Sequence, residues 1–253
     1  MTSDPGGYSR LMDYAAYVEH VRRDGERLAA AASGSLSSDV PSCPGWTVRD
    51  LVCHVAEVYE DKIARTALGR GPDPWPPEWP ADRDPIEWLG DAHGRLLEMF
   101  EGSGPTTPSA TWWPPDQTVG FWARRMAHET AVHRTDAELA IGAPTPVDAE
   151  LAVDGVDEIL VIMLEGDWSD EPDDAATGQR VGISAGERTW CITLEKESVR
   201  ITSDLGAWDA TLGGDPSDIL LWLWGRSPDD DVVRSGNEDA FRVLRSRLVL
   251  ATQ

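Results

Sequence analysis

The amino-acid sequence predicts an α+β protein, with an N-terminal four-helix bundle followed by a small α/β domain that contains an antiparallel sheet. Two observations lead to this fold class. Apolar residues recur every three or four positions in four segments before residue 142, and Gly- and Pro-rich loops separate those segments. Beyond GAPTP at 142–146 the pattern changes to alternating apolar and polar residues. We therefore expect two domains, 1–142 and 147–253, with GAPTP as the linker.

The first two helices are indicated by their apolar spacing and by the residues at their ends. Apolar side chains between 8 and 32 follow the repeat of an amphipathic helix, and a Ser/Gly stretch at 33–38 ends it. The second helix is expected at 48–68. Thr47 stands where a side chain can cap the helix start, and Asp50 follows three residues later in the first turn.

The third and fourth helices complete the predicted bundle. The segment 69–85 contains six prolines, which are incompatible with a helix interior, so it is expected to be a loop. A third helix is expected at 86–100. After another loop rich in Gly, Pro, Ser and Thr, the fourth helix begins near Thr118 and ends before Gly142. Four helices joined by loops indicate an up-and-down bundle.

The second half of the chain combines helices with short strands. Period-two alternation predicts three strands separated by short turns, at 180–184, 189–195 and 198–203. Helical patterns flank them, at 148–165, 214–226 and 238–250.

Composition excludes several classes of partner. Against 22 Lys and Arg stand 45 Asp and Glu, so the net charge of −23 disfavours nucleic acid and anionic membrane surfaces. The longest apolar runs, 159–164 and 219–224, are too short to cross a bilayer. The N-terminus lacks the pattern of a secretion signal, and three cysteines without a CxxC pair do not suggest a disulfide framework. We expect a cytoplasmic protein. The oligomeric state stays open, because the sequence contains no coiled-coil heptad that would indicate it.

The twelve tryptophans leave two interpretations open. Several lie beside prolines, as in PDPWPPEWP and TWWPP. They are either aromatic caps over helix ends or the apolar wall of a small-molecule pocket.

Glu129 and His133 are the first candidates for chemistry. On a helical wheel of the fourth helix they fall at the centre of an apolar stripe that includes Trp122 and Met126, four residues apart. A carboxylate buried in such a stripe needs a partner, because burial without one costs several kcal/mol. From these residues alone, a hydrogen-bonded Glu–His pair and a pair of metal ligands both remain possible.

His54 extends this pair to a possible metal site. It lies on the flank of the inward stripe of the second helix, so two facing helices can bring His54, Glu129 and His133 to one point. Three such ligands with one open position are typical of zinc, although nickel, cobalt or iron would also suit the set. The motif HETAVH differs from the HExxH of zinc proteases, because its histidines are five residues apart and do not share a helix face.

Three segments resemble a known family. CPGWTVRDLVCHVAE (43–57), ETAVHRTDAE (129–138) and LLWLWGR (220–226) are similar to the signature stretches of the mycothiol-dependent maleylpyruvate isomerase family, in the same order and over nearly the whole chain. The resemblance implies a DinB-like four-helix bundle that binds zinc through His54, Glu129 and His133. It also implies a small C-terminal α/β domain.

Other candidate residues carry two interpretations each. The resemblance implies that Arg226, at the end of the third segment, serves the active site in catalysis and in cofactor binding, whereas a surface or capping arginine is the alternative. Asp136 either accepts a hydrogen bond from a ligand imidazole or pairs with a nearby arginine, Arg125 or Arg134. Four further residues are assigned no chemical role: Cys43 and Cys53 are expected to be packing residues, and His20 and His93 surface residues.

The functional expectation is a mycothiol-dependent, metal-assisted isomerase or S-transferase that acts on a small electrophile. In this hypothesis the cation deprotonates the thiol and a zinc-bound thiolate is the nucleophile. Two alternatives stay open: a metal-dependent hydrolase, which needs a general base near the open position, and a metal- or ligand-binding protein without catalysis.

Overall fold

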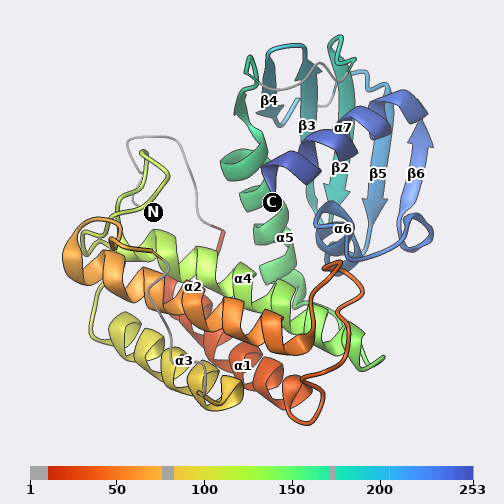
Figure 1. Cartoon of the computed structure of the whole chain (residues 1–253). Coiled ribbons are helices and arrows are strands. Elements are labelled where there is room, and N and C mark those ends of the chain that lie inside the picture. The colour runs from red at the N-terminus through yellow and green to blue at the C-terminus, as the bar shows by residue number, and fades with distance from the viewer. Residues whose placement is uncertain (1–10, 76–82, 171–174, 205, 253) are drawn as a thin grey trace. The chain divides into compact units, whose positions relative to one another are not determined.

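The computed structural model describes residues 11–75, 83–170, 175–204 and 206–252 (Figure 1). Two compact units divide the chain, Met1–Thr145 and Pro146–Gln253. Seven α-helices and six strands lie in the described ranges. No helix in those ranges combines the length and the apolar character needed to cross a membrane.

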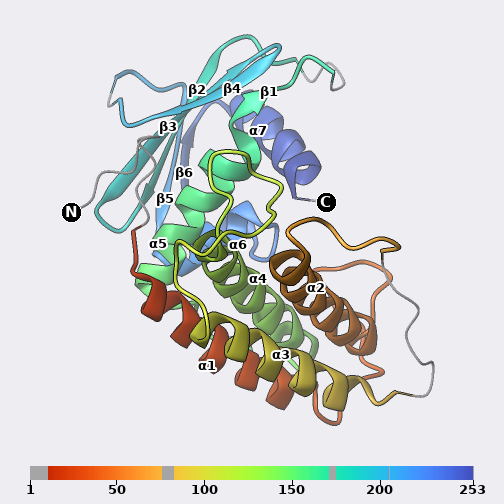
Figure 2. The same ribbon diagram turned by 90° about the vertical axis from the view of Figure 1, so that its left-hand side faces the viewer.

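The first unit is a bundle of four helices, which confirms the predicted fold class (Figures 1 and 2). Helix α1 packs mainly against α4 and also against α3, and α2 packs against α3 and α4. The helices are α1 (Tyr14–Ala32), α2 (Val48–Leu68), α3 (Pro85–Glu101) and α4 (Val119–Ala140).

The ends of α2 follow from local sequence. Thr47 and Asp50 form a capping box: the Thr47 N–H donates to the Asp50 carboxylate at 2.8 Å, and the Asp50 N–H donates to Thr47 Oγ1. At the other end Gly69 adopts a φ of 65°, a left-handed conformation that glycine reaches without steric cost. The prediction of a helix at 48–68 is therefore confirmed.

Helix α1 starts later than the apolar spacing predicts. Asp13 accepts a hydrogen bond from the Ala16 N–H at 2.8 Å and caps the helix, so residues 11–13 precede it. The proposed start at Tyr8 lies outside the described residues.

The second unit carries a mixed six-stranded sheet in the order β1-β4-β3-β2-β5-β6. Four neighbouring pairs are antiparallel, as expected, but β2 and β5 are parallel. The three strands predicted from the sequence pair antiparallel, as expected, but the whole sheet is mixed, because alternation along a strand does not encode its partner. The strands are β1 (Gly166–Asp167), β2 (Gln179–Ala185), β3 (Arg188–Glu195), β4 (Ser198–Thr202), β5 (Ala210–Gly214) and β6 (Val233–Gly236).

Helices accompany this sheet. Helix α7 (Glu238–Ala251) packs against β2 and β5 and runs across one face of the sheet (Figures 1 and 2). Helix α6 (Pro216–Leu223) packs against α5 (Ala149–Glu158). A single α-helix is predicted at 148–165. In the structure the α-helical hydrogen bonding ends at Glu158, and the chain continues directly as a π-helical segment, η1 (Ile159–Leu164). A short 3₁₀ turn, η2 (Asp229–Asp231), precedes β6.

Two of the Pro-flanked tryptophans contact the start of α4. The Trp113 ring stacks on Phe121 with centroids 6.0 Å apart, and Trp112 meets the same ring edge-on at 5.3 Å. This arrangement favours the interpretation of aromatic caps for the TWWPP segment. Trp79 of the other segment lies outside the described residues.

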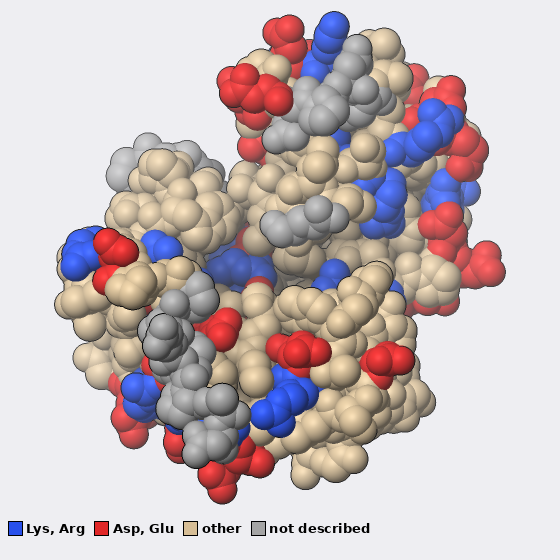
Figure 3. Space-filling view, viewed as in Figure 1, with Lys and Arg blue, Asp and Glu red and all other residues tan. Residues whose placement is uncertain are grey.

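Surface charge is interspersed on the face shown in Figure 3, where acidic and basic side chains lie close together rather than in separate fields.

Helix α4 is buried on nearly all sides. The helical wheel predicts a single apolar stripe, but every residue from 119 to 138 except Glu129 is buried. Its buried polar side chains therefore need partners within the bundle. They are Arg124, Arg125, His128, Thr130, His133, Arg134, Thr135, Asp136 and Glu138.

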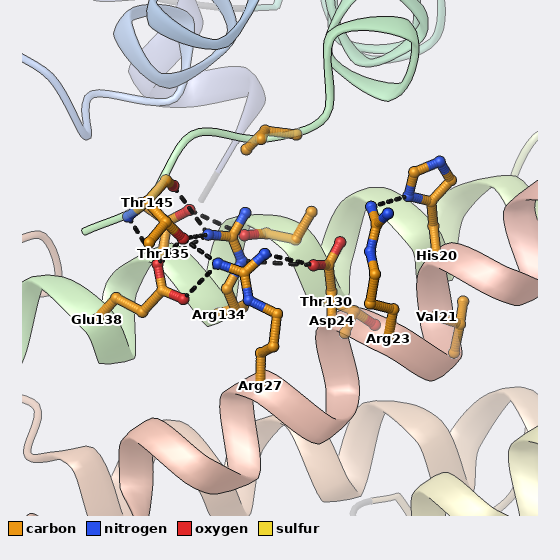
Figure 4. Close-up of polar contacts among 12 residues, drawn as sticks. His20, Val21, Arg23, Asp24, Arg27, Thr130, Arg134, Thr135, Glu138 and Thr145 are labelled. Atoms are coloured by element: carbon orange, nitrogen blue, oxygen red, sulfur yellow. Dashed lines mark hydrogen bonds and ion pairs between the residues drawn. The ribbon is translucent and has the colours of Figure 1, made fainter. Parts of the chain in front are cut away.

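One set of partners joins α4 to α1 and to the end of the first unit (Figure 4). Arg134 donates to Glu138 Oε2 at 2.8 Å, and its Nε lies 3.6 Å from Asp24 Oδ1. Glu138 also accepts from Arg27 at 3.0 Å and from the Thr145 N–H at 2.8 Å. Burial by itself would raise the pKa of Glu138, but Thr145 and Arg134 hold it below its usual value. The carboxylate thus ties three segments of the bundle together.

Replacing Glu138 with Gln should lower the free energy of unfolding by about 2 kcal/mol, because buried Arg134 would lose its nearer carboxylate partner and keep only Asp24, at 3.6 Å. A depressed folded-state pKa stabilises the fold above the unfolded value and loses that effect as pH falls, so the difference from wild type should shrink in acid. Denaturant titrations at neutral and acidic pH measure both effects. Glu101→Gln, at the exposed ion pair with Arg22, is the control and should cost below about 1 kcal/mol. Equal losses in the two variants would contradict the prediction.

Candidate metal centre

His54 on α2 and Glu129 and His133 on α4 lie together in the bundle. One potential ligand atom from each falls within 4.8 Å of the other two. Glu129 Oε1 is 3.2 Å from His133 Nε2 and 3.4 Å from His54 Nε2. The side chains of Glu129 and His133 are 15% and 10% exposed and that of His54 is 37% exposed, so the cluster opens to its surroundings on the His54 side.

Helix geometry explains this meeting. Glu129 and His133 are four residues apart and stand one turn above the other on α4. The His54 ring approaches from α2 and meets the His133 ring edge-on, with centroids 5.1 Å apart. The Trp46 ring is also a neighbour of His54, with centroids 5.1 Å apart and the two planes tilted by 59°. The loop before α2 therefore contributes an aromatic neighbour to the partly exposed imidazole.

Arg125 occupies the second oxygen of Glu129. Its guanidinium donates to Oε2 at 2.6 Å from one turn earlier on α4 and is 6% exposed. Oε1 is thereby left directed at the two imidazoles. Burial by itself would raise the pKa of Glu129, but His133, His54 and Arg125 together hold it well below its usual range, so the carboxylate is ionised.

Asp136 orients His133. Its Oδ2 is 2.9 Å from His133 Nδ1, and the side chain is fully buried. The hypothesis that Asp136 accepts a hydrogen bond from this imidazole is confirmed. Ser42 also donates to Asp136, and the Cys43 thiol lies 3.8 Å from Oδ2. Cys43 is thus a neighbour of the cluster's supporting carboxylate rather than the packing residue that the sequence suggested.

The His133 ring links two carboxylates. Burial would lower the pKa of His133, but the charge of Glu129 and the hydrogen bond to Asp136 raise it to about 9. At neutral pH, and without a bound cation, the ring therefore donates protons to both acids. A divalent cation would take the place of the proton on Nε2 and leave the Nδ1–H bond to Asp136 intact.

The donor set fits a zinc ion. Two nitrogens and one carboxylate oxygen are common zinc ligands, and the nitrogen–oxygen separations of 3.2 and 3.4 Å match the roughly 3–4 Å expected between ligands of one ion. Only three protein ligands converge in the described part of the chain, which corresponds to an open site.

Arg226 lies in the other unit, after α6. Its Nη1 donates to the Trp224 carbonyl at 2.7 Å, and its guanidinium lies 5.8 Å from the centre of the Trp224 ring. These contacts hold the side chain against the LWLWGR segment. Its catalytic and cofactor-binding role stays a prediction.

The other histidines correct the sequence-based expectation. His20 is 8% exposed and bonds through Nδ1 to Arg23 at 2.8 Å, so it is not a surface residue. His93 lies 3.0 Å from the Val21 carbonyl, and burial lowers its pKa.

Sequence reasoning missed Ser42 and Trp46 as neighbours of the cluster, and it considered Arg125 as a partner of Asp136 rather than of Glu129. Arg125 carried a usable signal, because it stands four residues before Glu129 on the same helix face. Ser42 and Trp46 carried none, since they lie on a loop whose position depends on how α2 packs against α4.

Comparisons with known proteins show the family of the chain. The family model described as mycothiol maleylpyruvate isomerase N-terminal domain matches residues 18–138, and the MDMPI C-terminal domain model matches residues 150–242. The chain belongs to the mycothiol-dependent maleylpyruvate isomerase family. The resemblance inferred from the three sequence segments is therefore confirmed.

Two solved structures of mycothiol-dependent maleylpyruvate isomerase share the fold of this family member. One, a point mutant of that enzyme, is 12% identical, with a TM-score of 0.61, and the other is 13% identical, with a TM-score of 0.53. Each comparison covers 93% of this chain and 96% of the other. Among proteins with curated descriptions, none matches the chain.

Metal analysis tests the cluster directly. Wild-type protein should contain about one zinc ion per chain, and His133→Ala should lose it because two ligands hold zinc poorly. Elemental analysis of untagged protein gives the stoichiometry. His93→Gln, at another histidine of the bundle, is the control and should keep its metal. A wild type that stays empty after zinc is supplied would exclude the metal centre.

Asp136→Asn should weaken zinc binding by about 10- to 100-fold, because an amide no longer balances the charge of the ligand imidazole. Competition with a chromophoric chelator measures the affinity. Ser42→Ala removes a different bond to the same carboxylate and should weaken binding less. An unchanged affinity in Asp136→Asn would show that this acid does not support the ligand.

Proposed function

We propose that this protein is a mycothiol-dependent, metal-assisted isomerase or S-transferase that acts on a small electrophilic substrate. His54, Glu129 and His133 are its metal ligands, and zinc is the proposed metal. The observation that carries the proposal is the convergence of these three side chains in an open cluster of a chain that belongs to this isomerase family.

The residues around the cluster have defined tasks in this proposal. Arg125 keeps Glu129 ionised and binds its outer oxygen, so that Oε1 stays available to the cation. Asp136 fixes the tautomer of His133 with the proton on Nδ1, which leaves Nε2 as the ligand atom. A bound zinc ion would lower the pKa of an incoming thiol and make its thiolate available near neutral pH.

Arg226 is proposed to bind the thiol cofactor and to serve catalysis. A guanidinium recognises carboxylates through two parallel hydrogen bonds, and the side chain is held by the Trp224 carbonyl at the end of α6.

The rest of the proposal concerns the whole protein. Residues 1–142 and 147–253 are proposed as separate domains, with the thiol and the small electrophile as partners. The three cysteines are free thiols, which suits a cytoplasmic location.

Zinc-loaded protein should isomerise maleylpyruvate, or conjugate monobromobimane, with mycothiol present and not without it. His54→Ala should abolish turnover, since it removes a ligand. Arg226→Met should raise the KM for mycothiol, with partial recovery in Arg226→Lys. Stopped assays with and without the thiol measure these effects. Turnover of a fully metallated protein that is independent of thiol would instead favour a hydrolase.

Cobalt substitution separates thiol binding from turnover. Mycothiol should change the visible spectrum of the cobalt-loaded protein if the sulfur enters the coordination sphere. A spectrum that stays unchanged at saturating thiol would exclude the zinc-bound thiolate even if the protein is an active enzyme.

A further inference from the structure

A second cluster of binding features lies in the C-terminal unit, around Arg245. Two cavities of about 270 and 330 Å³ border this residue and share Asp229 and Arg245 as wall residues. We call them together the Arg245 pocket. Its walls also include the apolar faces of Trp222, Phe241 and Val249. A site of this size with aromatic walls and a few charged groups suits a small molecule.

The Arg245 guanidinium is held in place by an aromatic ring. Its central carbon lies 3.8 Å from the centre of the Trp222 ring, and Nη1 makes a long bond of 3.4 Å to the Leu223 carbonyl. The side chain is half-buried, and burial lowers its pKa although Asp229 acts in the opposite direction. Stacking against the indole orients the planar group and leaves most of its N–H donors unused.

The neighbouring charges in the pocket are already paired. Asp229 accepts from Trp222 Nε1 at 2.7 Å and forms an ion pair with Arg234. Arg234 also binds Glu238 at 2.5 Å. Arg242, a further wall residue, pairs with Asp239 outside the pocket. Among the basic wall residues, and within the described part of the chain, Arg245 alone has no ion pair.

An oriented cation that forms no ion pair of its own is unexpected in a chain of net charge −23, where carboxylates outnumber basic groups about two to one. Asp229 acts on Arg245 only from beyond ion-pair distance, since its carboxylate is engaged by Trp222 and Arg234. Half-burial reduces the compensation that water gives to this charge. An anionic ligand would supply the missing partner, and the fork of N–H groups matches a carboxylate.

We propose that the Arg245 pocket binds a small organic carboxylate, with the acid group on the guanidinium edge of Arg245 and an apolar body against Phe241 and the neighbouring apolar walls. The pocket is lined by residues of the C-terminal unit alone, and none of them is a proposed metal ligand. It does not depend on the proposed function.

Calorimetric titration of the metal-free, full-length chain with benzoate tests the proposal. Benzoate should bind, and benzamide, its uncharged isostere, should bind at least about tenfold more weakly because it offers no charge to the guanidinium. Arg245→Met should lower the affinity for benzoate by a similar factor. Absence of benzoate binding, or equal binding of benzamide, would overturn the proposal.

Matched variants locate the site. Arg242→Met removes another arginine from the same wall, one that is already paired, and should bind benzoate as wild type does. His133→Ala should also bind as wild type does, because it alters only the other unit. If Arg245→Met does not fold by circular dichroism, Arg245→Lys replaces it and should weaken binding severalfold, since lysine lacks the planar fork. Benzoate binding that survives in the folded Arg245 variant would place the ligand elsewhere.

Discussion

The burial of α4 is the constraint on which the first unit depends. A helix enclosed on nearly all sides normally carries apolar residues, yet this one buries arginines, histidines and acids along its length. Each of these groups would cost several kcal/mol without a partner, so the neighbouring elements must provide partners at fixed positions. Near the C-terminal end of α4, the partners of Arg134 and Glu138 lie on α1 and at Thr145. Glu129 and His133 meet His54 of α2.

The two carboxylate oxygens of Glu129 have different partners, and this difference leaves one oxygen available as a metal ligand. One carboxylate oxygen is engaged by Arg125, and the other is turned toward two imidazoles. On the far side of His133, Asp136 fixes the ring through Nδ1. Both supporting groups are almost fully buried, whereas His54 is partly exposed. The ligand positions are thus rigid where the core holds them and accessible where a cation or thiol would enter.

The C-terminal unit uses charge differently. Its acids and arginines pair among themselves along α7 and the turn before β6, and Trp222 and Phe241 provide aromatic surfaces for cations. Arg245 is oriented by one of those surfaces but is not neutralised by the pairs around it. A carboxylate ligand would complete the same pattern of pairing.

The sequence by itself determined the fold class, the limits of α2 and the three residues of the cluster, because helix periodicity, capping and a recognisable family pattern are local properties. It did not determine that α4 is enclosed on all sides or that β5 pairs in parallel with β2, since neither fact is encoded within a single element. Only the tertiary structure brought Ser42 and Cys43 to Asp136, because a loop far away in sequence reaches α4 through the packing of α2. Contacts between distant segments depend on how whole helices pack, and the spacing of side chains along one helix does not predict that packing.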